Sequence, residues 1–66
     1  MSAPTYVIEY ERVSGEVEEV AAIFPTIDDA ETVCENMWSR YAPSEKFARF
    51  SVLNAETRET ISELEC

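Results

Sequence analysis

An alternation of apolar and polar positions opens the chain and predicts a β-strand over residues 5–13, which are rich in β-branched and aromatic side chains. The alternation places three large side chains on one face: Tyr6, Ile8 and Tyr10. The next two residues supply a tight turn, in which Gly15 can adopt a positive φ. The pattern therefore predicts a hairpin whose second strand covers residues 16–24.

The facing of this second strand has two solutions. One places Val20, Ala22 and Phe24 toward the core, and the other places Ala21 and Ile23 there. The bulk of Phe24 favours the first.

A helix is predicted to follow the second strand. Thr26 is a good N-cap, and Asp29 three residues later comes close to a capping box. From residue 27 to 41 the apolar side chains recur with a period of about 3.6 and form one buried face. Pro43 ends the helix near residue 41.

The remaining residues predict one or two further strands. Residues 49–54 read as a third strand with Phe50 and Val52 facing inward, and residues 58–62 are long enough to pair back as a short edge strand. The fold class is α+β, with the order ββαβ(β) and an antiparallel three- or four-stranded sheet. Its first strand is central and one helix packs on one face. Residues 1–66 form a single domain with an ordered core of about 5–64.

Charge changes this picture more than any motif does. The 66 residues hold 14 acidic and 5 basic side chains, for a net charge of −9. Residues 1–36 hold nine acids against one base, and residues 37–66 hold five against four. Such a balance argues against direct binding to nucleic acid or anionic lipid. The apolar runs are too short for a signal peptide or a membrane span.

The residues that carry most catalytic chemistry are missing or isolated. The chain has no histidine, one glycine and two cysteines. Cys34 falls on the apolar helix face as a small core residue, and Cys66 is the last residue, which fits a reducing cytoplasm better than a disulfide framework. We therefore expect no enzyme activity, no catalytic residues, no metal site and no cofactor.

Carboxylates are the remaining candidates for function. Residues two apart on a strand recur every ~6.6 Å and those three or four apart share a helix face, so the acids form short rows on the hairpin and the helix exterior. These are the predicted partner-binding residues: Glu9, Glu11, Glu16, Glu18, Asp28, Asp29, Glu31 and Glu35. Such rows can imitate the charges of a nucleic-acid backbone and occupy a groove lined by Lys and Arg.

Simpler explanations exist for individual acids. Asp28, Asp29 and Glu31 lie in the first helical turn, where carboxylates favour the positive end of the helix dipole. Glu16 and Glu18 on an edge strand discourage pairing with other chains. Neither explanation accounts for the concentration of charge in one half of the chain.

The size, element order and acidity together resemble the small stand-alone inhibitors encoded by phages and mobile elements, in particular the acidic anti-CRISPR proteins of the type I-F kind. This resemblance covers the whole chain but includes no diagnostic motif. It implies that an acidic helix, here carrying Asp28, Asp29, Glu31 and Glu35, contacts a Lys/Arg surface where target DNA would bind.

Two functional hypotheses follow. The first is a non-catalytic, cytoplasmic inhibitor or regulator that occupies the basic surface of a nucleic-acid-binding protein or complex. The second is a small structural or accessory subunit that docks through its exposed sheet face, with Val7 and Val13 beside an aromatic residue at an apolar contact. A homodimer that pairs through sheet faces or edges is compatible with both.

Overall fold

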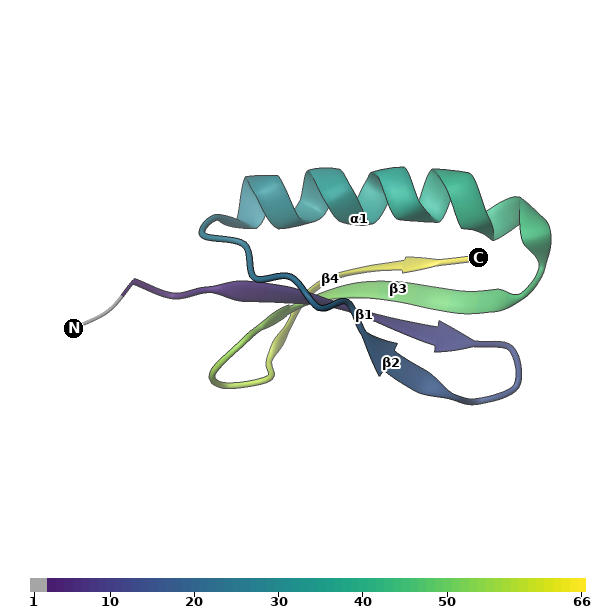
Figure 1. Cartoon of the computed structure of the whole chain (residues 1–66), viewed down its shortest axis with the longest axis horizontal. Coiled ribbons are helices and arrows are strands. Elements are labelled where there is room, and N and C mark those ends of the chain that lie inside the picture. Colours follow the sequence, from purple (N-terminus) through teal and green to yellow (C-terminus); the bar gives the residue numbers. More distant parts are fainter. Residues whose placement is uncertain (1–2) are drawn as a thin grey trace.

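The computed structural model describes residues 3–66 and has one helix packed on one face of a four-stranded antiparallel sheet (Figure 1). The elements are β1 (Tyr6–Arg12), β2 (Val17–Glu19), α1 (Ile27–Tyr41), the short 3₁₀ helix η1 (Ala42–Ser44), β3 (Phe47–Asn54) and β4 (Thr60–Glu65). The strand order is β2-β1-β3-β4. The α+β class, the fourth strand and the central position of the first strand are confirmed. The single domain expected over residues 1–66 includes residues 1–2, which lie outside the described residues.

The core lies between α1 and the two central strands. β1 and β3 pair from Tyr6 opposite Asn54 to Tyr10 opposite Phe50 and beyond. Because side chains alternate across a strand, one face of this pair points toward the helix. The buried residues of this core cluster are Tyr6, Ile8, Ala30, Cys34, Phe50 and Val52. The predicted inward residues of both central strands are therefore confirmed.

The turn between β1 and β2 is one residue longer than predicted. Gly15 has a φ of 97°, and its N–H donates to the carbonyl of Arg12 at 2.9 Å. The N–H of Arg12 in turn donates to the carbonyl of Glu16 at 2.8 Å, so residues 13–15 form a three-residue loop. This loop type needs a left-handed residue at its last position, which glycine adopts without steric cost.

The second strand is much shorter than residues 16–24. β2 ends at Glu19, and the chain returns to β1 only where Phe24 pairs with Tyr6 in an isolated bridge. The segment between Glu19 and Phe24 contains two more residues than a regular antiparallel ladder along β1 would need. Val20 and Phe24 nevertheless both pack against the core, while Ile23 is 68% exposed. The preferred facing is thus correct for these two side chains, although one continuous strand is not.

Local signals set both ends of α1. The Oγ1 of Thr26 accepts a hydrogen bond from the N–H of Asp29 at 3.1 Å, which caps the first turn. Pro43 lies in the 3₁₀ turn η1, immediately after the helix ends at Tyr41. Within residues 3–66, no helix has the length and apolar character that crossing a membrane requires.

The helix lies off-centre on the sheet. Among the described residues, α1 packs on β3, β1 and β4 but does not contact β2. The start of α1 and the β3–β4 turn lie toward one end of the molecule, and the end of α1 and the β1–β2 turn toward the other (Figure 1). β4 covers Thr60–Glu65 instead of residues 58–62, because Arg58, with a φ of 64°, belongs to the preceding turn.

Candidate functional site

Three arginines form ion pairs with all five glutamates of the β1–β2 hairpin. Arg12, Arg49 and Arg58 each have two carboxylate partners within 4.0 Å. Two of these arginines come from the second half of the chain. Folding therefore places positive charge beside the most acidic part of the sequence and partly neutralises the hairpin.

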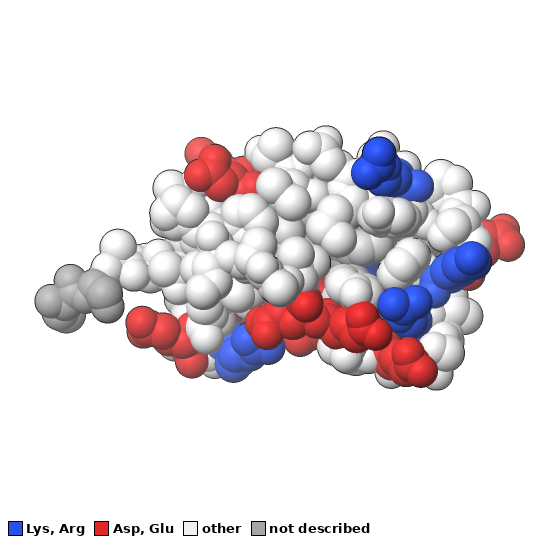
Figure 2. Space-filling view, viewed as in Figure 1, with Lys and Arg blue, Asp and Glu red and all other residues white. Residues whose placement is uncertain are grey.

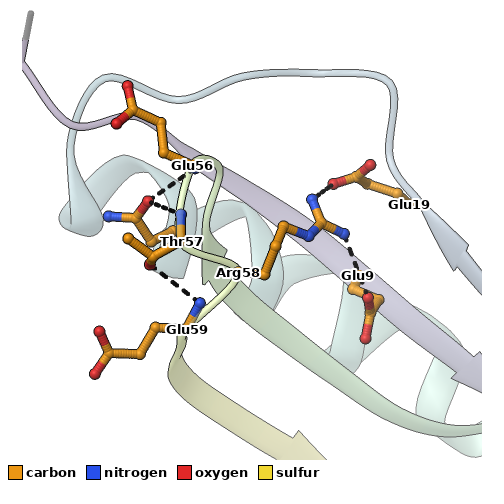
Figure 3. A network of polar contacts seen from close by, with 7 residues as sticks. Glu9, Glu19, Glu56, Thr57, Arg58 and Glu59 are labelled. Atoms are coloured by element: carbon orange, nitrogen blue, oxygen red, sulfur yellow. Dashed lines mark hydrogen bonds and ion pairs between the residues drawn. The ribbon is translucent and has the colours of Figure 1, made fainter.

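Arg58 connects the β3–β4 turn to the first hairpin. Its Nη1 lies 2.7 Å from Oε1 of Glu19 in β2, and its Nη2 lies 3.7 Å from Oε2 of Glu9 in β1. Figure 3 shows the side chain extending from the turn toward both strands. Asn54 holds this turn, because its Oδ1 accepts two backbone N–H groups at 2.8 and 3.0 Å. The hydrogen bond to Glu19 raises the pKa of Arg58, which keeps the guanidinium charged.

Arg49 bridges the neighbouring strands on the same helix-free face of the sheet. Its Nη2 lies 3.0 Å from Oε1 of Glu11 in β1, and its Nη1 lies 3.2 Å from Oε1 of Glu63 in β4. Glu11 is its register partner across β1 and β3. Alternating charges thus run across the face that the helix leaves open.

Arg12 and Glu18 form a second cluster on the side of the sheet that faces the helix. The hydroxyl of Tyr10 donates to Oε2 of Glu18 at 2.6 Å, and Nη2 of Arg12 lies 3.5 Å from the same oxygen. Oε2 of Glu16 lies 3.9 Å from Nε of Arg12. The bond from Tyr10, and next the charge of Arg12, lower the pKa of Glu18, while that bond raises the pKa of Tyr10.

The structure does not bring the eight predicted partner-binding residues onto one surface. Glu9 and Glu11 lie on the helix-free face of the sheet, whereas Glu18 pairs with Tyr10 on the opposite face. All four predicted hairpin carboxylates, including Glu16, are occupied by arginines of the same chain. The helix carboxylates are in a different state.

Asp28, Glu31 and Glu35 form what we call the helix row. At 100° per residue they fall within an arc of about 60° on α1, and Asp29 lies roughly 100° away from Asp28. Over residues 3–66 none of these four carboxylates takes part in an ion pair. The helix row is therefore negative charge that the described part of the chain leaves uncompensated.

Trp38 fixes the side of the molecule on which the helix row lies. Its indole Nε1 donates to the carbonyl oxygen of Glu65 in the edge strand β4 at 3.0 Å. Because Trp38 follows Glu35 by three residues, both lie on the same side of α1. The helix row thus runs along the β4 side of the helix.

One face of the molecule shows how acidic and basic groups are distributed over the sheet side and the helix side. Figure 2 shows acidic side chains along the sheet side of the molecule, interleaved with basic ones. The helix side in the same view carries an acidic group toward the start of α1 and a basic group toward its end.

The apolar sheet face required by the second hypothesis is not present as expected. Val7 points to the helix-free face but is only 6% exposed, and its register partner Leu53 is 5% exposed. Val13, in contrast, is 65% exposed in the β1–β2 turn. Val7 and Val13 therefore do not form a shared apolar contact surface.

The thiol of Cys34 has the environment of a core residue. It is 1% exposed, and burial, followed by the charges of Glu35 and Glu31, raises its pKa to about 11. In the described part of the chain, no group of three or more Cys, Asp or Glu side chains is arranged to hold a metal ion. The thiol is thus kept protonated at neutral pH.

Part of this arrangement was accessible from sequence and part was not. An antiparallel pairing of the first and third strands would have suggested that Arg49 faces Glu11. No local signal in the sequence indicated the ion pairs of Arg58. They depend on the left-handed backbone conformation of this residue and on partners that are 39 and 49 positions away in the chain.

No protein-family model matches the sequence, and neither a curated protein nor a solved structure matches the chain.

Proposed function

We propose that this protein is a non-catalytic acidic binding protein that inhibits or regulates a nucleic-acid-binding protein by occupying its basic surface. The observation that carries the proposal is the contrast between its two acidic regions. Five hairpin glutamates are held by arginines of the same chain, whereas the helix row forms no ion pair within residues 3–66. Carboxylates without counter-ions remain available to cations of a partner.

The geometry of the helix row suits a groove lined by Lys and Arg. Asp28 and Glu35 are seven positions apart on the helix, which corresponds to about 10 Å along the helix axis. Surface charges at this spacing attract a basic groove over distances comparable to the Debye length and accelerate encounter. An anti-CRISPR-like inhibitor of phage origin, acting in the cytoplasm, is one member of this functional class.

The first test compares binding of wild type and a charge-reversed helix row. Asp28→Lys, Glu31→Lys and Glu35→Lys together are expected to weaken binding to the captured partner by about tenfold or more, because three attractive contacts become repulsive. The partner is captured from extracts of the source cells on the immobilised wild-type protein at low salt. Affinity is then measured by surface plasmon resonance at increasing salt.

A matched control changes the same net charge elsewhere. Glu56→Lys, Glu59→Lys and Glu65→Lys alter three exposed acids without an ion pair among residues 3–66. We expect these changes to weaken binding much less. The captured partner is also assayed for binding to a labelled oligonucleotide, which the wild-type protein should displace. Equal loss of affinity in both triple variants, or no displacement of the oligonucleotide, contradicts the proposal.

A further inference from the structure

β4 is an edge strand, and its outer side is not covered by another strand of the described chain. In the order β2-β1-β3-β4 it pairs with β3 alone. The N–H of Cys66 donates to the carbonyl oxygen of Ala48 at 3.0 Å, so the backbone groups of Cys66 point toward β3. Because these groups alternate in direction along an antiparallel strand, those of Glu65 and Glu63 point away from the sheet.

One of these outward groups is bonded to the helix, and the others are free. The carbonyl oxygen of Glu65 accepts the indole N–H of Trp38 at 3.0 Å. The N–H of Glu65 and both backbone groups of Glu63 have no such partner among residues 3–66. A row of unpaired backbone donors and acceptors is a template on which an extended chain can add as a strand.

The bond from Trp38 also shows that side chains on this side of α1 extend to the outer edge of β4. Figure 1 shows α1 and β4 running in the same direction. Glu31 precedes Trp38 by seven positions, which is about 10 Å along the helix axis and only ~20° around it. About three residues of a strand cover the same distance, so Glu31 lies level with Ser62. The helix row therefore flanks the space in which a further strand beside β4 would run.

The charges on the two faces of this space differ. On the helix side, the helix row forms no ion pair within residues 3–66. On the helix-free side, the carboxylate of Glu63 is already held by Arg49 at 3.2 Å. An added strand with basic side chains toward the helix is consequently attracted. A second copy paired through its own β4 would bring its helix row against the first, so repulsion disfavours that occupant.

We propose that β4 receives an extended segment of the basic partner as a fifth, antiparallel strand, with Lys or Arg at alternate positions facing the helix row. The proposal rests on the function proposed above and adds the conformation and position of the partner's contacting segment. Alternate side chains of a strand recur every ~6.6 Å, so two of them cover most of the ~10 Å of the helix row. Antiparallel alignment continues the pattern of the other strand pairs.

The test uses peptides that differ only in the position of backbone methyl groups. Acetyl-Thr-Lys-Thr-Lys-Thr-Lys-Thr-amide is titrated into the ¹⁵N-labelled protein, and amide chemical shifts are followed by NMR. Residues opposite each other in an antiparallel ladder share a face and a bonding direction. Threonines opposite Glu63 and Glu65 therefore direct their N–H groups to β4, while lysines facing the helix row direct theirs to solvent.

N-methylation of the two inner threonines should weaken binding about tenfold, because it removes two backbone hydrogen bonds. N-methylation of two lysines keeps the same charge and number of methyl groups and should change the affinity by less than about twofold. Equal affinity of the two methylated peptides overturns the proposal. If that result occurs while the captured partner still requires the helix row, this inference fails and the proposed function stands.

The outward N–H of Glu63 provides a second test on the protein itself. Glu63→Pro removes this donor, and Glu63→Gln removes the same charge but keeps the donor, so the proline variant should bind the unmethylated peptide about fivefold more weakly. Equal binding to these two variants contradicts strand addition.

Hydrogen exchange measures the same donor without a substitution. In the wild-type protein, exchange of the Glu63 amide should slow about tenfold at a peptide concentration of about ten times Kd. Unchanged exchange at that concentration overturns the proposal. Exchange that slows with protein concentration in the absence of peptide would assign the edge to a second copy and would overturn it as well.

Discussion

Cys34 and Cys66 are both free thiols, but they lie in opposite environments. Cys34 is 1% exposed in the core, and burial with the nearby carboxylates of Glu35 and Glu31 raises its pKa to about 11. Cys66 is exposed, and its slight burial raises the pKa of its thiol less than the deep burial of Cys34 does. Because the thiolate is the reactive form, only one of the two thiols is available to reagents in the native state.

This contrast predicts selective alkylation. Brief treatment of the native protein with iodoacetamide at pH 8 should modify Cys66, whereas Cys34 should react only after unfolding in urea. Mass spectrometry of the proteolytic fragments measures both positions. Cys66→Ser is the control, because it should give no adduct in the native state and one adduct in urea. Comparable native rates at the two thiols would show that the core opens at Cys34.

At the scale of elements, α1 depends on a local cap that sequence alone identifies. Oγ1 of Thr26 accepts the N–H of Asp29, one of the donors that a helix start leaves without an internal partner. Thr32 lies within the same helix, and its hydroxyl donates to the carbonyl oxygen of Asp28 at 2.8 Å. Alanine substitutions at the two threonines therefore separate the effect of losing the N-cap from the effect of losing a hydroxyl group within the helix.

Thr26→Ala should lower the free energy of unfolding by about 1 kcal/mol, because it removes the N-cap acceptor. Thr32→Ala should change it by less than about 0.5 kcal/mol, because alanine has the higher helix propensity and the lost bond is exposed. Urea denaturation followed by circular dichroism measures both values. A larger loss for Thr32→Ala would mean that the helix start is held by packing and not by the cap.

The elements that sequence predicted well are those set by neighbouring residues. The period of the apolar residues, Thr26 and Pro43 gave the helix with its observed bounds. The second strand failed as a single element, because the run from Val20 to Phe24 is apolar at every position and lacks an alternation that would show where pairing stops. The fourth strand moved toward the C-terminus, because Arg58 adopts a left-handed conformation that extends the turn.

The candidate site divides in the same way. The helix row follows from spacing along one helix and was predicted from sequence. The ion pairs of Arg49 and Arg58 depend on strand register and on a turn conformation, so the sequence did not show that the hairpin glutamates would be compensated. The hollow between α1 and the segment that follows β2, lined among others by Tyr10, Met37 and Tyr41, depends on the offset of α1 from β2, which only tertiary packing determines.

At the scale of the whole molecule, repulsion and local attraction respond differently to salt. The net charge is −9, while the ion pairs of the three arginines join atoms 2.7 to 3.9 Å apart. Screening removes interactions over long distances first, and exposed pairs contribute only about 0–1 kcal/mol each. The compact state therefore gains more from reduced repulsion than it loses from weaker ion pairs.

We predict that the melting temperature rises by about 4 °C between roughly 0.01 M and 0.1 M NaCl, as the Debye length falls from about 30 to 10 Å. Differential scanning calorimetry at constant pH measures the change. Replacing Asp28, Glu31 and Glu35 by their amides should reduce the salt dependence, because the net charge becomes less negative. A melting temperature that falls with added salt would show that the arginine ion pairs outweigh the repulsion.

The bond between Trp38 and the carbonyl oxygen of Glu65 has an optical consequence. The chain contains one tryptophan, so its intrinsic indole emission arises from the contact between α1 and β4. The helix row lies on this same side of the helix. Indole fluorescence is consequently a built-in probe that reports, without a label, a partner bound on the helix row.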